Sequence, residues 1–229
     1  MQPLPLLERV RLIPIIELDP WAFEKHERPR PDGSLFEVLQ QWQEFWVAAL
    51  ADSGLTGLEA IQPGSWQVPI QNLSDRQLEI ILDAELKKLE IEDIATCEID
   101  ELVAFSGGFA LWTEEEGAIY EPQCCGDLKD LASWKEAAIY QKGNWEMLWI
   151  GHPWLSYRYE NGFLQLSDLH EDTEPIAKWQ ISSEILADAV SLAEIQRHAF
   201  VEQLELILKK RNLNRDTKPL ASTLAGLIA

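Results

Sequence analysis

The sequence predicts an α+β fold, with a mostly antiparallel sheet over about residues 102–181 flanked by N-terminal and C-terminal helices. Outside this range apolar residues recur every three or four positions, which indicates amphipathic helices. Inside it, short apolar runs are separated by glycine, proline and asparagine, as is typical of strands joined by turns. A chain of 229 residues buries roughly 70 to 75% of its unfolded surface, so its core needs no disulfide or metal. One domain with appended helices is the simplest count, and two small domains are the alternative.

The first 33 residues contain six of the twelve prolines. Proline removes a backbone donor and stops a helix, so we expect residues 1–33 to form a proline-rich N-terminal arm laid over the domain, with one short strand over residues 10–18. We expect a single α+β domain over residues 34–211 and a C-terminal tail over residues 212–229. The apolar end of this tail is too short to cross a membrane and predicts a docked or a disordered end.

Two helices are expected before the sheet because each has a start signal of its own. In each, a serine is followed three residues later by Glu or Gln, which is the pattern of a capping box. Apolar residues then follow at helical spacing. The expected helices cover residues 35–52 and 75–89, and their capping pairs are Ser34 with Glu37 and Ser74 with Gln77.

The sheet itself is expected to begin with strands over residues 102–105 and 109–112. Between them lies Ser106-Gly107-Gly108, whose paired glycines allow positive φ or a close approach of two backbones. A further strand is expected to end at Tyr120, because proline follows soon after it. A helix over residues 128–142 then precedes the second half of the sheet.

The hairpin over residues 154–168 has the clearest signal. Asn161-Gly162 is typical of a two-residue loop with positive φ at both positions. This loop fixes a register in which Tyr157 faces Leu166 and Tyr159 faces Leu164, so that one side is apolar and the other mostly polar. A strand over residues 176–181 and a helix over residues 184–210 complete the fold. The apolar face expected for this last helix contains Leu192, Ile195, Ala199, Phe200, Leu204, Ile207 and Leu208.

The charge limits the classes of partner. A formal net charge of −20 argues against nucleic acid and against an anionic membrane, because both are bound through Lys and Arg. It permits a basic protein partner. With no signal peptide and no transmembrane stretch, and with only three cysteines, the sequence predicts a reduced cytoplasmic protein. It does not indicate the oligomeric state.

The adjacent Cys124 and Cys125 admit three interpretations. As buried thiols they would behave as small hydrophobic residues. A metal site would need cysteine or histidine partners at matched spacing, which the sequence lacks, so no metal and no cofactor are expected. A cysteine nucleophile would need a base and an orienting group, which His152 and Asp127 could supply. Signature motifs for phosphate loops, dinucleotide binding, zinc proteases and serine hydrolases are absent from the sequence.

Ten tryptophans are present, and three of them lie within ten residues of one another between positions 145 and 154. Tryptophan is a common anchor of protein interfaces, so an exposed aromatic patch is one expectation and core packing is the other. The residues expected to bind a partner are Glu121, Cys124, Cys125, Asp127, Trp145, Trp149, His152 and Trp154.

The order of elements between residues 75 and 208 resembles the SUKH superfamily. The resemblance is carried by an acidic helix, the segment from Leu102 to Gly108, two strands, Asp127-Leu128 leading to a short helix with Trp134, further strands and a final helix. It implies an α+β fold and a relation to immunity proteins that bind and neutralise toxins, many of them nucleases. Only Gly107 and Gly108 correspond to the family's fold markers.

These observations favour a non-catalytic cytoplasmic protein-binding module, such as an immunity-type inhibitor of a basic partner. One alternative is a small cysteine-dependent enzyme that uses Cys124 or Cys125 with His152. A second alternative is a structural subunit.

Overall fold

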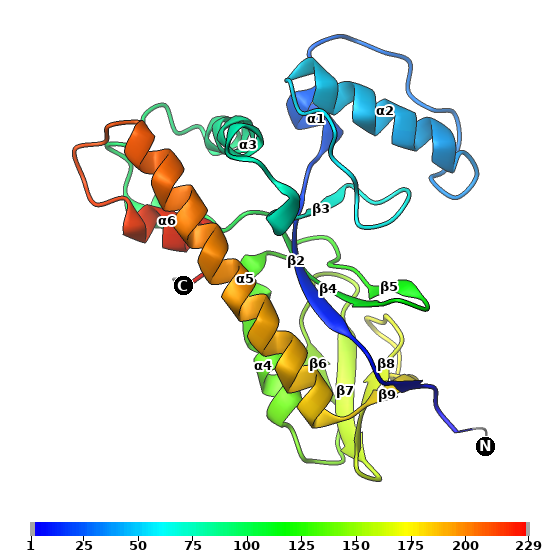
Figure 1. Cartoon of the computed structure of the whole chain (residues 1–229). Helices are drawn as coiled ribbons and strands as arrows, with labels where there is room; N and C mark the ends of the chain where they lie inside the picture. Colours follow the sequence, from blue (N-terminus) through cyan, green and yellow to red (C-terminus); the bar gives the residue numbers. More distant parts are fainter. Residues whose placement is uncertain (1–2, 228–229) are drawn as a thin grey trace. The chain divides into compact units, whose positions relative to one another are not determined.

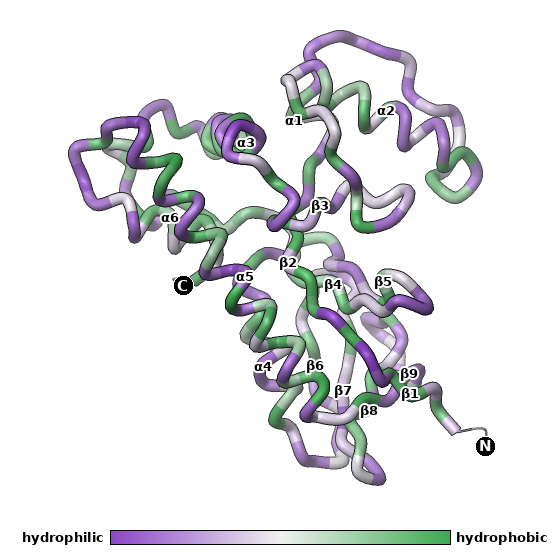
Figure 2. The backbone as a smooth tube through the Cα atoms, viewed as in Figure 1, coloured by the Kyte–Doolittle hydropathy of each residue, from purple (hydrophilic) through white to green (hydrophobic). Residues whose placement is uncertain are grey.

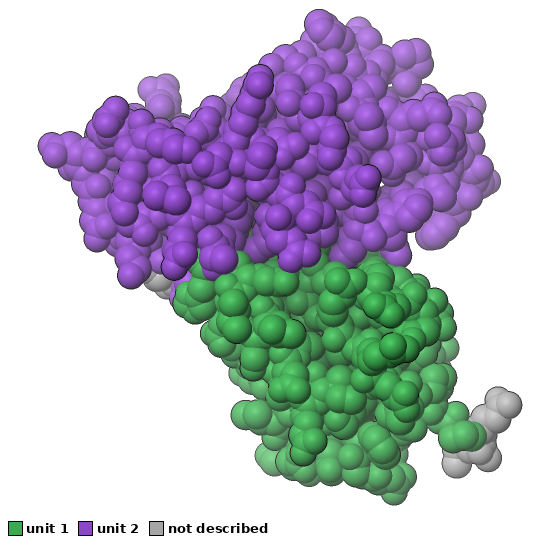
Figure 3. All heavy atoms as spheres, in the orientation of Figure 1, with its two compact units in different colours: residues 1–15, 106–198, 229 green, residues 16–105, 199–228 purple. Residues whose placement is uncertain are grey.

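A computed structural model describes residues 3–227 of the chain. In the described chain, unit 1 comprises residues 3–15 and 106–198, and unit 2 comprises residues 16–105 and 199–227 (Figure 3). The boundary divides strand β2 (Arg11–Glu17) after Ile15 and helix α5 (Ser183–Lys210) after His198. The chain has an α+β fold, as predicted, with helices beside one mixed and one further sheet.

The larger sheet lies in unit 1 and has five strands in the order β1-β9-β8-β7-β6 (Figure 1). Its central strands are antiparallel, whereas β1 pairs in parallel with β9 at one edge. The strands cover Leu6–Leu7 (β1), Glu146–Leu148 (β6), Leu155–Glu160 (β7), Phe163–Ser167 (β8) and Ala177–Ile181 (β9).

The hairpin of β7 and β8 has the predicted register. Tyr157 pairs with Leu166 and Tyr159 with Leu164. Asn161 and Gly162 both have positive φ, at 54° and 88°, as the two-residue loop requires. The register could be predicted from the hairpin's own residues because the two-residue turn and the alternation of apolar side chains specify the same pairing.

The second side of this hairpin is mostly polar, as predicted, yet several of its polar residues are buried. Ser156, Gln165 and Ser167 on that side are all buried. The Tyr120 hydroxyl donates a 2.6 Å hydrogen bond to the Ser167 carbonyl, and the Ser156 amide donates to the Ser167 hydroxyl at 2.8 Å. Gln165 accepts a bond from Arg158 Nε at 2.9 Å, so each of these buried polar groups has a hydrogen-bond partner.

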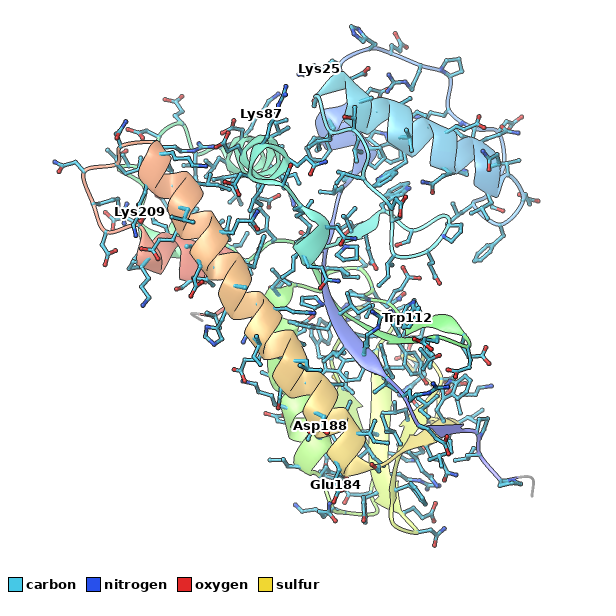
Figure 4. The ribbon with its side chains drawn as sticks, viewed as in Figure 1. Lys25, Lys87, Trp112, Glu184, Asp188 and Lys209 are labelled. Atoms are coloured by element: carbon cyan, nitrogen blue, oxygen red, sulfur yellow. The ribbon has the colours of Figure 1, made fainter. Side chains whose placement is uncertain are left out.

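The smaller sheet has the order β3-β2-β4-β5, with β3 over Gln67–Pro69, β4 over Gly107–Thr113 and β5 over Gly117–Tyr120. The strand expected over residues 102–105 does not form, and Gly107 and Gly108 belong to β4 instead of separating two strands. Their φ values of 132° and 136° confirm the predicted positive φ. The ring of Trp112, which lies on β4 (Figure 4), has the guanidinium carbon of Arg11 at 4.0 Å from its centroid.

Helix α4 and the first part of α5 complete unit 1. A 3-10 turn over Leu128–Asp130 leads into α4 (Leu131–Ile139), so the expected helix ends earlier than residue 142. Helix α5 is continuous over its 28 residues, and Figure 2 shows hydrophobic and hydrophilic residues alternating along it. Its buried face differs from the expected one: Leu192 and Ile195 are 59% and 64% exposed, and Ala199 is exposed. The buried positions of α5 include Leu186, Ala189, Val190, Ala193, Phe200, Val201, Leu204, Ile207 and Leu208.

Unit 2 contains α1 (Pro20–Phe23), α2 (Leu39–Asp52), α3 (Asp75–Lys88), the second part of α5 and α6 (Lys218–Leu224). The capping box predicted for α3 is present. Helix α2 begins at Leu39, four residues later than expected: the Glu37 carboxylate accepts a bond from the Ser34 amide, but residues 35–38 form a turn and a bend, and the helix is capped at Val38 without a side-chain bond.

Within residues 3–227, both terminal segments take part in regular structure. The N-terminal arm contributes β1 and β2 to the two sheets, and β2 confirms the strand expected over residues 10–18. In the tail, α6 is docked through buried residues such as Leu220 and Leu224, whereas residues 228 and 229 lie outside the described part of the chain. The boundaries expected at residues 34 and 211 do not coincide with those of the units, and the single domain stays a prediction. Among the described residues, no helix combines the length and apolarity needed to span a bilayer.

Candidate functional site

The candidate site is built from three segments of unit 1 that are far apart in the sequence. Residues 121–127 follow β5, residues 149–154 connect β6 to β7, and residues 168–170 follow β8. Backbone hydrogen bonds join them: the amide of Gln123 donates to Ile150 at 2.6 Å and that of His152 to Cys124 at 2.9 Å. Trp154 and His170 exchange two further bonds, of 3.2 and 3.0 Å. The site therefore has a well-connected backbone although it consists of loops.

Two glycines permit this close approach. A Cβ on Gly151 would lie 2.5 Å from the carbonyl oxygen of Gln123 and would also overlap the carbonyl of Cys124. On Gly126 a Cβ would lie 2.7 Å from the Gly107 carbonyl oxygen. In addition, Gly151 has a φ of 102°, a backbone conformation that residues other than glycine rarely adopt.

Three aromatic rings meet on these loops, and we call Trp149, His152 and Trp154 the aromatic cluster. The His152 ring stands edge-on to both indoles, at centroid distances of 4.7 Å from Trp149 and 5.4 Å from Trp154. The two indoles are stacked at 6.4 Å with an interplanar angle of 24°. Such edge-to-face and stacked geometries are favourable for aromatic pairs and limit the freedom of each ring.

The aromatic cluster reaches the surface. His152 is exposed, and both indoles are half-buried. Of the ten tryptophans only Trp46 and Trp134 are fully buried, so core packing does not account for most of them. Flat, partly exposed rings on an anchored backbone offer contact area for another molecule at a small entropic cost.

An acidic loop begins immediately after His170. Glu171, Asp172 and Glu174 are exposed, and the backbone pairing of Trp154 with His170 brings this loop next to the aromatic cluster. His170 itself is buried, and its Nε2 lies 2.9 Å from the Ser156 hydroxyl.

The Ser156–His170 pair has the separation of a nucleophile and its base. However, only 5% of Ser156 and 9% of His170 is accessible, so a substrate could not reach the hydroxyl. His170 Nδ1 has no hydrogen-bond partner, and a catalytic histidine would need an orienting group there. The pair is a buried polar contact between the start of β7 and the loop after β8.

The cysteines do not follow the expectation of buried thiols. Cys124 and Cys125 are both exposed, and their sulfur atoms lie 3.5 Å apart. Cys97 in unit 2 is buried, and burial is the main cause of the raised pKa of its thiol. Exposed thiols are accessible to reagents and ligands, whereas Cys97 is shielded.

The structure brings together most of the residues predicted from the sequence. Cys124, Cys125, Trp149, His152 and Trp154 share one surface, and Glu121 lies half-buried at the start of the same loop. Two predicted residues have other roles. The Asp127 carboxylate accepts a 2.6 Å bond from the Lys129 amide and caps the turn before α4, whereas Trp145 packs under Arg158 at 4.6 Å, outside the aromatic cluster.

This arrangement does not complete a catalytic triad. The carboxylate proposed to orient His152 is that of Asp127, which is used in helix capping. Within residues 3–227, no group of three or more His, Cys, Asp or Glu side chains is placed to hold a metal ion.

Sequence reasoning missed a second group of aromatic rings, which lies in unit 2. Trp21, Trp42, Phe45 and Trp66 have centroid distances of 5.1 to 6.4 Å. Their positions come from α1, α2 and the segment before β3, so no local pattern marks them. The acidic loop is visible in the sequence as four acidic residues around His170, a pattern that predicts a solvated turn and not its place beside the aromatic cluster.

Comparisons of the chain with models of protein families, with curated proteins and with solved structures found no match. By its fold and its site, the chain is an α+β protein with an exposed aromatic cluster on converging loops.

Proposed function

We propose that this chain is a non-catalytic protein-binding module whose contact surface is the aromatic cluster. The observation that carries the proposal is the stacking of Trp149 and Trp154 around the exposed His152. Tryptophan is enriched among the residues that contribute most to protein interfaces, because one side chain buries a large area with few rotatable bonds.

The anchored loops support this proposal energetically. Binding costs free energy for each side chain or loop that becomes ordered in the complex. Here the backbone bonds from His152 to Cys124 and between Trp154 and His170 hold the cluster before any partner arrives. The loss of conformational entropy on binding is correspondingly small.

The charge supports a basic partner. Residues 3–15 and 106–198 contain 17 Asp or Glu and 8 Lys or Arg, a net charge of −9 with histidine neutral. The exposed carboxylates of Glu171, Asp172 and Glu174 are concentrated beside the aromatic cluster. Such a surface attracts cationic groups, which the indole faces can also bind.

The resemblance to the SUKH superfamily extends the proposal to an immunity-type inhibitor. In this reading the partner is a basic toxin and binding blocks its activity. An acidic, rigid surface fits an enzyme that acts on nucleic acid, because such an enzyme must itself present a basic surface.

The proposal is tested by capture of a partner on the full chain and by affinity measurements with the purified partner. Trp149→Ala and Trp154→Ala should each lower affinity by about tenfold or more, as expected for interface anchors. Trp145→Ala is the matched control, since Trp145 is half-buried in the same unit and lies outside the cluster. Neutralising Glu171, Asp172 and Glu174 should slow association and reduce its salt dependence.

Two results would contradict this function. One is that no protein is captured at either low or high salt. The other is a captured partner whose affinity is unchanged by both cluster variants, because the contact would then lie elsewhere on the chain.

The cysteine-dependent enzyme remains a second proposal because the backbones of Cys124 and His152 are directly hydrogen-bonded. A catalytic thiolate would be alkylated rapidly near neutral pH. Slow alkylation of both exposed cysteines in the folded protein would exclude this chemistry.

A further inference from the structure

The adjacent cysteines form a pair whose sulfur atoms are already close. The Sγ atoms of Cys124 and Cys125 lie 3.5 Å apart, and both residues are exposed. Adjacent residues usually direct their side chains apart, but Cys125 has a φ of 69°. This left-handed conformation is uncommon for a residue with a side chain.

The loop that carries the pair is fixed on both sides. The carbonyl of Cys124 accepts the His152 amide at 2.9 Å, and the Gly126 amide donates to Gln123 at 3.0 Å. The carbonyl of Gly126 in turn accepts the Gly107 amide at 3.0 Å. The two sulfur atoms are therefore presented together without a need for further ordering, which favours any ligand that bonds to both.

Geometry distinguishes two possible products of this pair. A disulfide usually joins Cα atoms roughly 4.4 to 6.8 Å apart, whereas a trans peptide holds neighbouring Cα atoms about 3.8 Å apart. A disulfide here would be strained and readily reduced. A single atom bonded to both sulfurs at about 2.3 Å with a tetrahedral angle spans about 3.8 Å between them, close to the observed separation.

We propose that Cys124 and Cys125 form a two-sulfur site for one thiophilic atom, of the class represented by trivalent arsenic in a monosubstituted arsenical. The arsenic forms two As–S bonds, its oxygen leaves as water with the two thiol protons, and no atom changes oxidation state. Zinc would need further protein ligands, and the described residues supply no set of three or more. A centre that needs only two protein sulfurs fits the site.

The probe is phenylarsine oxide added to the full chain, with intact mass as the readout. The expected product is one adduct per chain, heavier by the reagent less one water. It should be displaced by a dithiol and should resist an excess of monothiol, because the second As–S bond is intramolecular and raises affinity by about 100-fold or more. Cys124→Ser and Cys125→Ser should each remove this resistance.

Cys97→Ser is the matched control, since that thiol is buried in unit 2, and it should leave the adduct unchanged. The inference is overturned if the wild-type chain forms no adduct, if monothiol displaces it, or if it survives in both single variants. Monothiol competition on the Cys97→Ser protein requires neither Cys124→Ser nor Cys125→Ser. The proposal can therefore be tested even if one of these two variants fails to fold. No partner protein is used, and the outcome is therefore independent of the proposed function.

Discussion

Replacement of Gly151 by alanine tests whether close backbone contact builds the site. Two costs are expected. The first is conformational, because Gly151 has a φ of 102°, and alanine in place of a positive-φ glycine costs about 1 kcal/mol or more. The second is steric, because the added Cβ would lie 2.5 Å from the Gln123 carbonyl oxygen. Overlap of this kind costs typically about 1 to 3 kcal/mol.

Gly117→Ala separates the two costs. Gly117 also has a positive φ, of 74°, but an added Cβ would meet nothing within 4 Å. Gly151→Ala should thus lower the free energy of unfolding by about 2 to 4 kcal/mol. This loss should be larger than that of Gly117→Ala by the steric cost, about 1 to 3 kcal/mol. Urea unfolding, followed by both circular dichroism and tryptophan fluorescence, measures the difference. Equal destabilisation by the two variants would refute the close contact between residues 123–124 and Gly151.

Three further variants test other parts of the structure. Burial raises the pKa of Asp130 to about 7, so the folded protein holds a proton that the unfolded chain loses near pH 3.8. Stability should therefore fall as pH rises from about 4 to about 7, and thermal melts of Asp130→Asn should lack this pH-dependent loss. Tyr120→Phe removes the 2.6 Å bond to the Ser167 carbonyl and should cost about 1 to 3 kcal/mol in urea unfolding, and an unchanged midpoint would contradict that bond. Trp46→Ala removes a fully buried ring whose Nε1 donates to the Leu18 carbonyl at 3.0 Å and should cost about 3 to 5 kcal/mol, whereas a loss below about 1 kcal/mol would show that the ring is not a core residue.

Elements specified by their own residues could be predicted from the sequence. The Asn161-Gly162 hairpin has the expected register, because the two φ values that its turn needs are supplied within the turn. The capping box of α3 formed as expected, since both of its hydrogen bonds lie within four residues.

Elements that depend on distant partners were predicted less well. Residues 102–105 are apolar but form no strand, and the Phe105 amide instead donates to the carbonyl of Leu224, 119 positions later in the chain. In α5, two exposed residues, Leu192 and Ile195, were assigned to the buried face, because the sequence offers apolar residues on more than one side of the helix. Packing against the rest of the protein determines which side of α5 is buried.

For the site, composition identified the surface but not the roles of all its residues. Cys124 and Trp149 could be selected because unusual residues cluster in two short segments, yet their proximity depends on the bond from His152 to Cys124 across the loops. The capping role of Asp127 was open from the sequence, since the same carboxylate could have oriented a histidine. Only the position of the Lys129 amide decides this.

The distribution of polar bonds is the reason why we propose recognition ahead of bond-making chemistry. A catalytic site needs a base or nucleophile that remains available to a substrate. Here Cys124, Cys125 and His152 are exposed, but the Asp127 carboxylate that could have oriented His152 is used in capping, and the imidazole of His170 is buried against Ser156. Besides the two thiols, these loops present the exposed ring of His152 beside two half-buried indoles, with carboxylates in the adjoining loop. Such groups bind through area, ring faces and charge, and loops that hold them in place lower the entropic cost of binding a second protein.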